Sequence, residues 1–294
     1  MIKPMLAETA QLPFDRPDYI YEIKLDGVRC IAYLDGDTRL QARSGADITH
    51  KFPELANLHR QVSQPAILDG EIVSTSFRAI QHRIQRQKPL AIKVAQGQYP
   101  AFIHIFDVLD AGHENVMAKP QIERKAILQS IFSDSYHGRL LKWTTQGTAL
   151  AKLTKENGLE GIMAKGMYAP YVANKRASSW LKIKHFSEGA FYICGLTRGE
   201  RSFGSLVLGE VVNGQIVYVG NCGTGFDQGE MDRILHLLEP GDCPFQIRPD
   251  LGRELQTWAR PTLRCEVRYF ERTDTKLRFP SFRRLIGGLQ ERRG

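Results

Sequence analysis

Short apolar segments typical of strands, separated by polar turn residues, recur along residues 1–185. The segment YIYEIKLDGVRCIAYLDGDTRLQARSG (residues 19–45) predicts a strand, a loop, a second strand, an Asp-Gly turn and a third strand. Further strand patterns lie at residues 64–74, 101–110, 161–165 and 179–185. Because such short turns join antiparallel strands, we expect antiparallel sheets in this part of the chain.

Three segments between these strands have the apolar spacing of helices instead. They are the short basic segment 77–87, the amphipathic segment 119–132 and the segment 148–158, which ends at Asn157-Gly158. Helices combined with antiparallel strands indicate an α+β fold.

The pattern changes near residue 186. Short strands separated by glycine-rich turns follow, including Asn213-Gly214, a strong hairpin signal. One helical segment, residues 229–239, precedes a last strand pattern at residues 262–273. A hairpin, a helix and further strands within about 100 residues are typical of a small Greek-key barrel such as an OB-fold. We therefore predict an antiparallel-sheet domain at residues 1–185 and a small β-barrel OB-fold domain at residues 186–294.

Composition narrows the class of protein. The 294 residues suffice for about two domains, and the net charge of +8 favours a polyanionic partner such as nucleic acid. The apolar runs are too short for a membrane span, and the N-terminus lacks the apolar core of a signal peptide. Five widely spaced cysteines, none in a C-x-x-C pair, argue against a zinc module and a disulfide framework. We expect a cytoplasmic protein with reduced thiols.

Candidate chemistry begins with the motif K-x-D-G at Lys24–Gly27. Alone, this motif fits a solvated lysine beside a turn equally well. Four later motifs follow it in order: Asp69-Gly-Glu71, Phe106-Asp107 within an apolar strand, Glu160-Gly-x-x-x-Lys165, and Lys182-x-Lys184. The last two lysines share one strand face, where they are costly to bury unless an anion meets them.

This ordered set resembles the motifs of the covalent nucleotidyltransferases, the superfamily of ATP-dependent DNA ligases, RNA ligases and mRNA capping enzymes. The resemblance covers residues 20–285, including the change to an OB-like domain. It is closest to ATP-dependent DNA ligases, and especially to the ligase module of bacterial end-joining ligases, through EIKLDGVR, ARSG, TRGERSFGSLVLG and LRFPSFRR. The resemblance implies that residues 1–185 form a nucleotidyltransferase (adenylation) domain.

The resemblance makes Lys24 the nucleophile that attacks the α-phosphate of ATP and forms lysyl-AMP. Free lysine has a pKa of about 10.4, so nearby cations must favour its neutral amine. By family position, Lys182 and Lys184 would supply that charge and neutralise the α-phosphate. Glu160, with Asp26 as a second or outer ligand, would hold Mg²⁺, for which Mn²⁺ can substitute.

The resemblance also implies a set of nucleotide contacts. Phe106 would stack on adenine, Glu22 would accept a hydrogen bond from the adenine amino group, and Glu71 would accept one from a ribose hydroxyl. Arg29 would hold the ribose or a phosphate. The other implied contacts are those of Lys165 and Arg278 with ATP and of Arg43 with the 5′-phosphate at the nick, because a guanidinium matches phosphate bidentately.

The C-terminal segment RFPSFRRLIGG departs from the family pattern, because the acidic-basic pair that usually follows it is absent. Arg278, Arg283 and Arg284 are candidates for pyrophosphate contacts. A basic tail that faces DNA or solvent fits these arginines equally well.

These motifs predict an ATP-dependent DNA ligase that seals nicks between a 5′-phosphate and a 3′-hydroxyl in DNA repair or end joining. The enzyme would adenylate itself, pass AMP to the 5′-phosphate of nicked double-stranded DNA, and release AMP when the 3′-hydroxyl attacks. An RNA ligase, a capping-type nucleotidyltransferase and a non-catalytic DNA-binding relative are the alternatives; Glu22 and the segment ARSG speak against the capping enzyme. We expect a monomeric, minimal ligase of two domains, and a Ku-type end-binding protein is the partner that the resemblance suggests.

Overall fold

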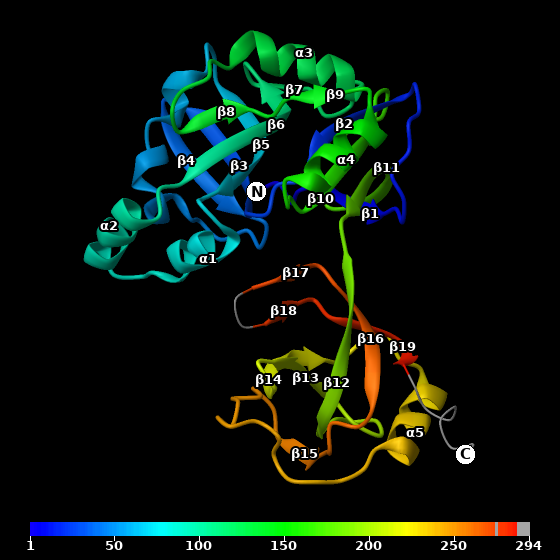
Figure 1. Cartoon of the computed structure of the whole chain (residues 1–294). Coiled ribbons are helices and arrows are strands. Elements are labelled where there is room, and N and C mark those ends of the chain that lie inside the picture. The colour runs from blue at the N-terminus through cyan, green and yellow to red at the C-terminus, as the bar shows by residue number, and fades with distance from the viewer. Residues whose placement is uncertain (274–275, 287–294) are drawn as a thin grey trace. The chain divides into compact units, whose positions relative to one another are not determined.

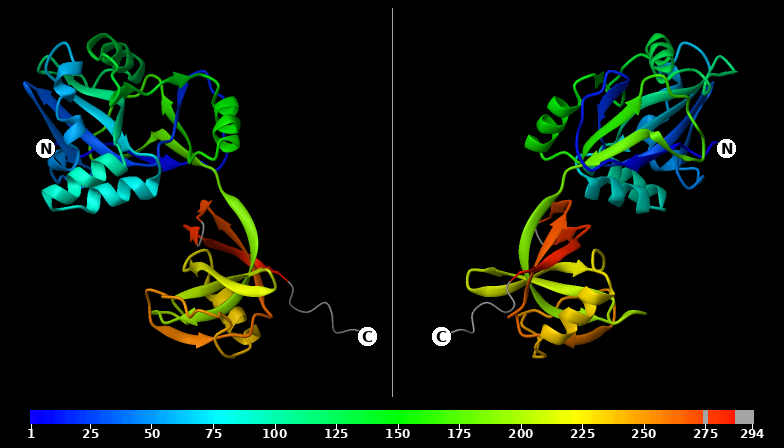
Figure 2. Two further views of the ribbon diagram at one scale, coloured as in Figure 1. Left: turned by 60° about the vertical axis from the view of Figure 1, so that its left-hand side comes forward. Right: turned by 90° about the vertical axis from the view of Figure 1, so that its right-hand side faces the viewer.

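The computed structural model describes residues 1–273 and 276–286 of the chain. The chain divides into two compact units, Met1–Lys184 (unit 1) and His185–Gly294 (unit 2), each with its own strands and helices (Figures 1 and 2). Within the described ranges, no helix is long and apolar enough to cross a membrane.

Unit 1 contains two sheets. The first has the order β1-β11-β10-β2-β9, and its strands are β1 (Leu6–Thr9), β11 (Arg176–Lys184), β10 (Gly161–Gly166), β2 (Tyr19–Ile23) and β9 (Trp143–Thr144). The second has the order β4-β3-β5-β6-β7 with β8 beside β6, and its strands are β4 (Asp37–Ala42), β3 (Val28–Asp35), β5 (Ala66–Val73), β6 (Phe102–Ala111), β7 (Glu114–Asn115) and β8 (Gly138–Leu140). The predicted antiparallel pairing is confirmed, except that β1 with β11 and β6 with β8 pair parallel.

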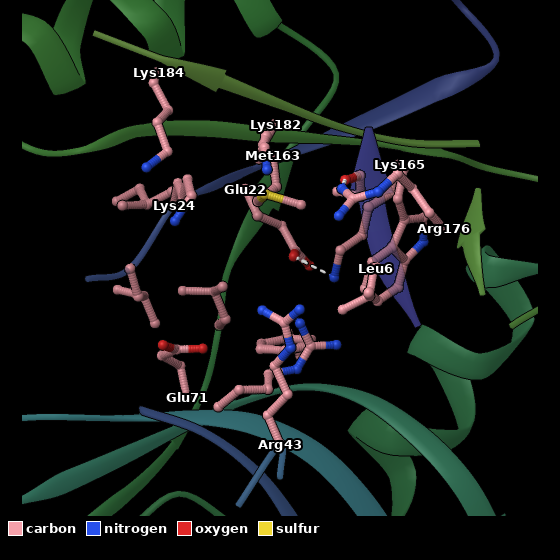
Figure 3. A pocket seen from close by; sticks show the side chains of 17 residues that line it. Leu6, Glu22, Lys24, Arg43, Glu71, Met163, Lys165, Arg176, Lys182 and Lys184 are labelled. Atoms are coloured by element: carbon pink, nitrogen blue, oxygen red, sulfur yellow. Dashed lines mark hydrogen bonds and ion pairs between the residues drawn. The ribbon is translucent and has the colours of Figure 1, made fainter. Parts of the chain in front are cut away.

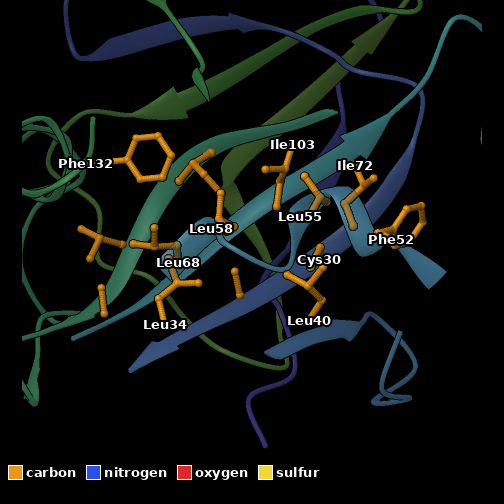
Figure 4. Packing of buried hydrophobic residues seen from close by; sticks show 14 of the residues in the cluster. Cys30, Leu34, Leu40, Phe52, Leu55, Leu58, Leu68, Ile72, Ile103 and Phe132 are labelled. Atoms are coloured by element: carbon orange, nitrogen blue, oxygen red, sulfur yellow. The ribbon is translucent and has the colours of Figure 1, made fainter. Parts of the chain in front are cut away.

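The main core of unit 1 lies on one face of the second sheet. Cys30, Ala32 and Leu34, at alternate positions of β3, are buried in a cluster with Phe52 and Leu55 (Figure 4). The last two come from the segment between β4 and β5, which contains three 3-10 helices, η1 (Thr49–Lys51), η2 (Pro53–Leu55) and η3 (Leu58–Gln61). Because strand side chains alternate between faces, the intervening residues of β3 project from the other face of the sheet.

Four α-helices accompany the sheets of unit 1. Helix α3 (Gln121–Ile131) packs on β6, and α4 (Gly147–Glu156) packs on β10 and β2. Helix α1 (Phe77–Gln85) packs on β5 and contacts α2 (Pro89–Gln98). The sequence predicts α1, α3 and α4, and these helices are confirmed.

Helix α2 is missing from the sequence-based prediction. Leu90 and Val94 are exposed, whereas Ile92 and Ala95 are buried. Apolar residues therefore occupy both faces of this helix, which obscures the helical period on which the prediction relies.

Unit 2 is built on a sheet of order β14-β13-β12-β16-β19, with β15 paired to β12. Its elements are β12 (Ser187–Thr197), β13 (Ser205–Val212), β14 (Gln215–Cys222), α5 (Gln228–Leu237), β15 (Leu255–Trp258), β16 (Arg264–Tyr269), β17 (Glu271–Arg272), β18 (Leu277–Arg278) and β19 (Ser281–Ile286). Asn213 and Gly214 have φ angles of 51° and 78°, the left-handed conformation of the predicted turn between β13 and β14. A separate apolar core, which includes Phe191, Leu206 and Phe282, stabilises this unit.

Candidate active site

A cavity of about 260 Å³ lies in unit 1 and is lined by residues of both sheets (Figure 3). Seven of its seventeen lining residues are Lys or Arg and two are Glu. Such an excess of cations in a partly buried space favours an anionic ligand. Nine residues predicted from the sequence line this cavity: Glu22, Lys24, Arg29, Arg43, Glu71, Phe106, Lys165, Lys182 and Lys184.

The first sheet presents its side chains to the cavity in cross-strand rows. Lys182 on β11 lies opposite Met163 on β10, which in turn lies opposite Glu22 on β2. In the next row, Trp180 lies opposite Lys165. Residues two positions apart on a strand share a face, so this register brings alternate residues of three strands into one cavity, as Figure 3 shows.

Lys24 follows β2 directly and forms an ion pair with Glu160. Glu160 is 6% exposed, and its other oxygen lies 2.6 Å from Nζ of Lys184. The Lys24 amide donates a hydrogen bond to the carbonyl of Gly161 at 2.9 Å, which holds the two charged residues side by side. Gly161 has a φ of 147°, and a Cβ there would lie 2.0 Å from the carbonyl oxygen of Ile183. Close strand approach therefore requires the glycine after Glu160.

The glycine of the K-x-D-G motif has a similar role. A Cβ on Gly27 would lie 2.3 Å from the carbonyl oxygen of Ile72 on β5. The loop that carries Lys24 can therefore approach the second sheet only with glycine at this position.

The positively charged side chains of the cavity repel one another. The pKa of Lys182 is lowered by burial and by the charges of Arg176, Lys184 and Lys24. An anion bound among these side chains would relieve the repulsion. Phosphate is the biological anion that lysine and arginine commonly bind.

Arg29 is held by a buried carboxylate that the sequence analysis did not assign. Its Nε and Nη2 lie 2.5 and 2.6 Å from the two oxygens of Asp69, which also accepts a hydrogen bond from the Tyr171 hydroxyl at 2.6 Å. Burial opposes the charge of Arg29, but the Asp69 carboxylate outweighs it and raises the pKa of the guanidinium. Nε and Nη2 of Arg29 are thus engaged by Asp69, so Nη1 is the guanidinium atom that would contact a nucleotide. In the sequence, Asp69 is marked only as the first acid of the Asp-Gly-Glu motif.

Glu71 is the cross-strand partner of Arg29 and lines the cavity. Burial raises the pKa of Glu71 to about 7, although the charges of Arg29 and Lys24 act in the opposite direction. This carboxyl group is therefore divided between its ionised and neutral forms near neutral pH.

Phe106 lies at a bulge in β6. Ile103 and Ile105 belong to the main core, so alternation along the strand places Phe106 on the opposite face. The pairing of β6 with β5 shifts between Ile105 and Asp107, so Phe106 is also the extra residue of the bulge. Its ring centre lies 6.3 Å from that of Trp180 in an edge arrangement. Nζ of Lys165 lies 4.2 Å from both ring centres. These aromatic side chains provide the cavity with an apolar wall suited to a flat ring.

Glu22 is 1% exposed and lies between two lysines. Lys125 of α3 forms an ion pair with one carboxylate oxygen, and Nζ of Lys165 lies 2.7 Å from the other. Burial lowers the pKa of Lys165 to about 8, and the attraction of Glu22 opposes this shift. The sequence did not identify Lys125 as a site residue, because a lysine on a helix far from the K-x-D-G motif looks like any solvent-exposed lysine.

The cavity also contains lining residues that the sequence analysis did not select: Leu6, Ala7, Ile23, Leu25, Leu141, Met163, Arg176 and Trp180. Trp180 could have been predicted from the sequence, because it precedes Lys182 by two residues and therefore shares its strand face.

Five of the site residues that the sequence analysis named do not line the cavity. Glu160 is one of them, although its carboxylate pairs with Lys24 and Lys184, which do line it. Asp26 follows Lys24 by two residues but is not among the lining residues. The three arginines of the C-terminal segment belong to unit 2, where each lies near an acid: Arg278 near Glu271, Arg283 near Glu188 and Arg284 near Glu266. Gly287 and Gly288, which end that segment, lie outside the described residues.

Comparison with known proteins defines the class. Residues 4–184 match the family model described as ATP dependent DNA ligase domain, and residues 199–286 match the ATP dependent DNA ligase C terminal region. The structure of mycobacterial DNA ligase D complexed with ATP and MES is 25% identical, with a TM-score of 0.57 over 97% of this chain and 95% of that chain. The fold is therefore that of a ligase nucleotidyltransferase domain followed by an OB-fold-like domain, which confirms the predicted fold class.

The chain belongs to the ATP-dependent DNA ligase family, whose domain model matches more than half of it. The SPbeta prophage-derived DNA ligase-like protein LigB of Bacillus subtilis is 32% identical over 69% of this chain and 74% of its own length. DNA ligase C1 of Mycolicibacterium smegmatis is 29% identical over 99% of this chain and 90% of its own length. The multifunctional non-homologous end joining protein LigD of the same organism is 28% identical over 96% of this chain, which spans 38% of that longer protein. As a member of this family, the chain is an ATP-dependent enzyme that acts on DNA.

Proposed function

We propose that this chain seals nicks between a 5′-phosphate and a 3′-hydroxyl in duplex DNA through a lysyl-AMP intermediate on Lys24. The ion pair of Lys24 with Glu160 beside a cavity rich in cations is the observation that carries this proposal. Lys24 would attack the α-phosphate of ATP and release pyrophosphate, AMP would pass to the 5′-phosphate, and the 3′-hydroxyl would then displace AMP. Each step is a substitution at phosphorus, so one set of cations can serve all three.

Lys182 and Lys184 would stabilise the charge that develops on the α-phosphate. Both side chains line the cavity next to Lys24, and preorganised cations act most strongly where water is excluded. In the resting cavity, Glu160 binds Lys24 and Lys184 at the same time. The phosphates of ATP would therefore compete with Glu160 for these two ammonium groups.

The base and ribose of ATP would occupy the opposite part of the cavity. Phe106 would stack on adenine beside Lys165, and Glu22 would accept a hydrogen bond from the adenine amino group. Glu71 would accept one from a ribose hydroxyl, and its cross-strand partner Arg29 would bind the ribose or a phosphate. The apolar ring wall, the buried carboxylate of Glu22 and the half-buried one of Glu71 support this assignment, because a base needs one flat surface and a few fixed polar groups.

The carboxylates near Lys24 fit a magnesium ion that keeps most of its waters. Glu160 offers hard oxygen ligands, and the described part of the chain contains no cluster of three or more Asp, Glu, His or Cys side chains that could enclose a metal. Glu160 would hold the ion, with Asp26 as an outer ligand, and Mn²⁺ would take the same place. Bound there, the ion would neutralise charge on the α-phosphate.

The DNA contacts would come from both domains. Residues 1–185 would carry the adenylation chemistry, and residues 186–294 would cover the DNA as an OB-fold. Arg43 follows β4 and lines the cavity, where its guanidinium would bind the 5′-phosphate of the nick. Arg278 would contact the pyrophosphate of ATP, which requires it to leave Glu271, whose carboxylate lies 2.6 Å away.

The pathway assignment rests on the relatives. Because the chain resembles proteins named for non-homologous end joining, we propose a role in DNA repair or end joining. A Ku-type end-binding protein would be its partner on broken ends, and the chain would act as a monomer at the bacterial nucleoid.

The decisive test is intact-mass spectrometry after incubation with ATP and Mg²⁺, in parallel with GTP and with the Lys24→Ala variant. We expect the wild-type chain to form an AMP-sized adduct with ATP, to react far more slowly with GTP, and the variant to form no adduct with either. Lys152→Ala, an exposed lysine on α4, is the matched control and should form the adduct normally.

Sealing of nicked DNA but not of nicked RNA would then separate a DNA ligase from an RNA ligase. Faster adduct formation with GTP than with ATP would indicate a capping-type enzyme. Protein isolated as the adduct should lose it to pyrophosphate. If the chain regenerated in this way formed no adduct, the lysyl-AMP mechanism would be overturned and the non-catalytic DNA-binding alternative would remain.

A further inference from the structure

Lys125 lies outside the cavity but is paired with a carboxylate that lines it. Its ammonium group meets Glu22, whose other oxygen faces Lys165. We propose that Lys125 is a positioning residue that keeps the Glu22 carboxylate correctly aimed, so that helix α3 helps to discriminate ATP from GTP. This inference rests on the proposed function, in which Glu22 accepts a hydrogen bond from adenine.

The place of Lys125 is set by a buried network at the start of α3. Nε and Nη2 of Arg124 lie 2.8 and 2.9 Å from the two oxygens of Asp107 on β6, and Gln121 donates a hydrogen bond to the same carboxylate at 3.1 Å. Burial opposes ionisation of Asp107, but the hydrogen bonds and charge of Arg124 outweigh it and lower the pKa of that acid. Arg124 thereby fixes α3 against β6, and this places the next residue, Lys125, within contact of Glu22.

The two lysines next to Glu22 are not equivalent. Lys165 lines the cavity and also faces the rings of Phe106 and Trp180, so a bound nucleotide would change its surroundings. Lys125 does not line the cavity and would keep its contact throughout the reaction. Lys125 is therefore the partner that holds the Glu22 carboxylate in place whatever occupies the cavity.

The placement of Glu22 matters because adenine and guanine carry different groups at C6, although guanine also differs at N1 and C2. Adenine presents an amino group, a donor, where guanine presents a carbonyl oxygen, an acceptor. An ionised carboxylate only accepts hydrogen bonds and has about four acceptor sites, so two lysines leave some of them for the base. A carboxylate held at the C6 position therefore favours the amino group of adenine over the carbonyl oxygen of guanine, and this preference is lost if the carboxylate is no longer held there.

The test is the ratio of kcat/KM for self-adenylation with ATP to that for self-guanylylation with GTP, measured for Lys125→Met. We expect this ratio to fall by at least about tenfold, the loss of roughly one hydrogen bond of discrimination. Both values come from the same preparation, so a smaller fraction of folded enzyme cancels from the ratio. Lys152→Met, whose side chain is 79% exposed on α4, is the matched control and should keep the wild-type ratio.

Two further variants keep the inference testable if Lys125→Met folds poorly. Glu22→Gln removes the carboxylate, and Glu22→Gln combined with Lys125→Met removes both charges without leaving one unpaired. If Lys125 acts through Glu22, the double variant should have the same ratio as Glu22→Gln. An unchanged ratio in Lys125→Met, or a lower ratio in the double variant than in Glu22→Gln, would overturn the inference. Neither result would affect the lysyl-AMP mechanism, which fails only if no adduct forms.

Discussion

Replacing Glu71 by Gln should stabilise the protein above neutral pH while it weakens the reaction with ATP. Burial raises the pKa of Glu71 from its ordinary 4.5 to about 7. The difference of about 2.5, at roughly 1.4 kcal/mol for each pKa unit, means that the ionised carboxylate destabilises the native state by up to about 3 kcal/mol. The amide of Gln carries no charge and does not incur this cost.

The sign of the pH dependence follows from proton binding. Between pH 4.5 and about 7, the native state holds more protons on Glu71 than the unfolded state does, so stability falls as the pH rises through this window. The cost is complete above the native pKa and absent below the unfolded one. The free energy of unfolding of Glu71→Gln should therefore exceed that of the wild type by about 1 kcal/mol near pH 5 and by up to about 3 kcal/mol near pH 8.

Urea unfolding of both proteins at these two pH values measures the difference. Glu156→Gln, with a side chain 59% exposed at the end of α4, is the control and should differ from the wild type by less than about 0.5 kcal/mol at either pH. A Glu71→Gln variant that is no more stable than the wild type near pH 8, or a gain that does not grow with pH, would refute the reasoning.

The same substitution should act in the opposite direction on function. The amide oxygen of Gln still accepts a hydrogen bond from the ribose but lacks the charge, so kcat/KM for self-adenylation should fall about tenfold near pH 8. The combination of higher stability and lower activity is expected where a fold retains an unfavourable buried charge for catalysis. An unchanged kcat/KM would remove Glu71 from the nucleotide site.

Three further substitutions test separate parts of the site. Arg43→Met should slow nick sealing by at least about tenfold while it slows AMP-adduct formation much less, as gel assays and intact mass would measure, and equal effects on both would argue against a DNA-phosphate contact. Asp69→Asn should lower the free energy of unfolding in urea by about 3–5 kcal/mol, because the Arg29 guanidinium loses its carboxylate partner. Tyr171→Phe keeps the ion pair and should lower it by only about 1–2 kcal/mol. Similar losses in the two variants would show that the ion pair is unimportant. Gly27→Ala should abolish adduct formation, since its Cβ would lie 2.3 Å from a β5 carbonyl oxygen, and a normal adduct would show that the loop does not need this approach.

The sequence by itself determined the features that depend on neighbouring residues. Strand alternation put Lys182 and Lys184 on one face, and both line the cavity. The Asn213-Gly214 pair marked a hairpin because Asn and Gly adopt positive φ at low cost. The order of five motifs indicated the ligase family, which the family models confirm. In each case the signal lies within a few residues of the chain, where periodicity and turn chemistry operate.

The tertiary structure decided which distant residues meet. A bulge in β6 changes the alternation, so that Ile105 and Val108, three positions apart, both belong to the main core, and the strand pattern does not reveal this shift. Asp69 holds Arg29 across two strands, and Lys125 reaches Glu22 from a helix about a hundred positions further along the chain. Buried charges are stable only where an opposite charge is brought to them. That pairing depends on sheet register and on the packing of α3 against β6, which no local pattern encodes.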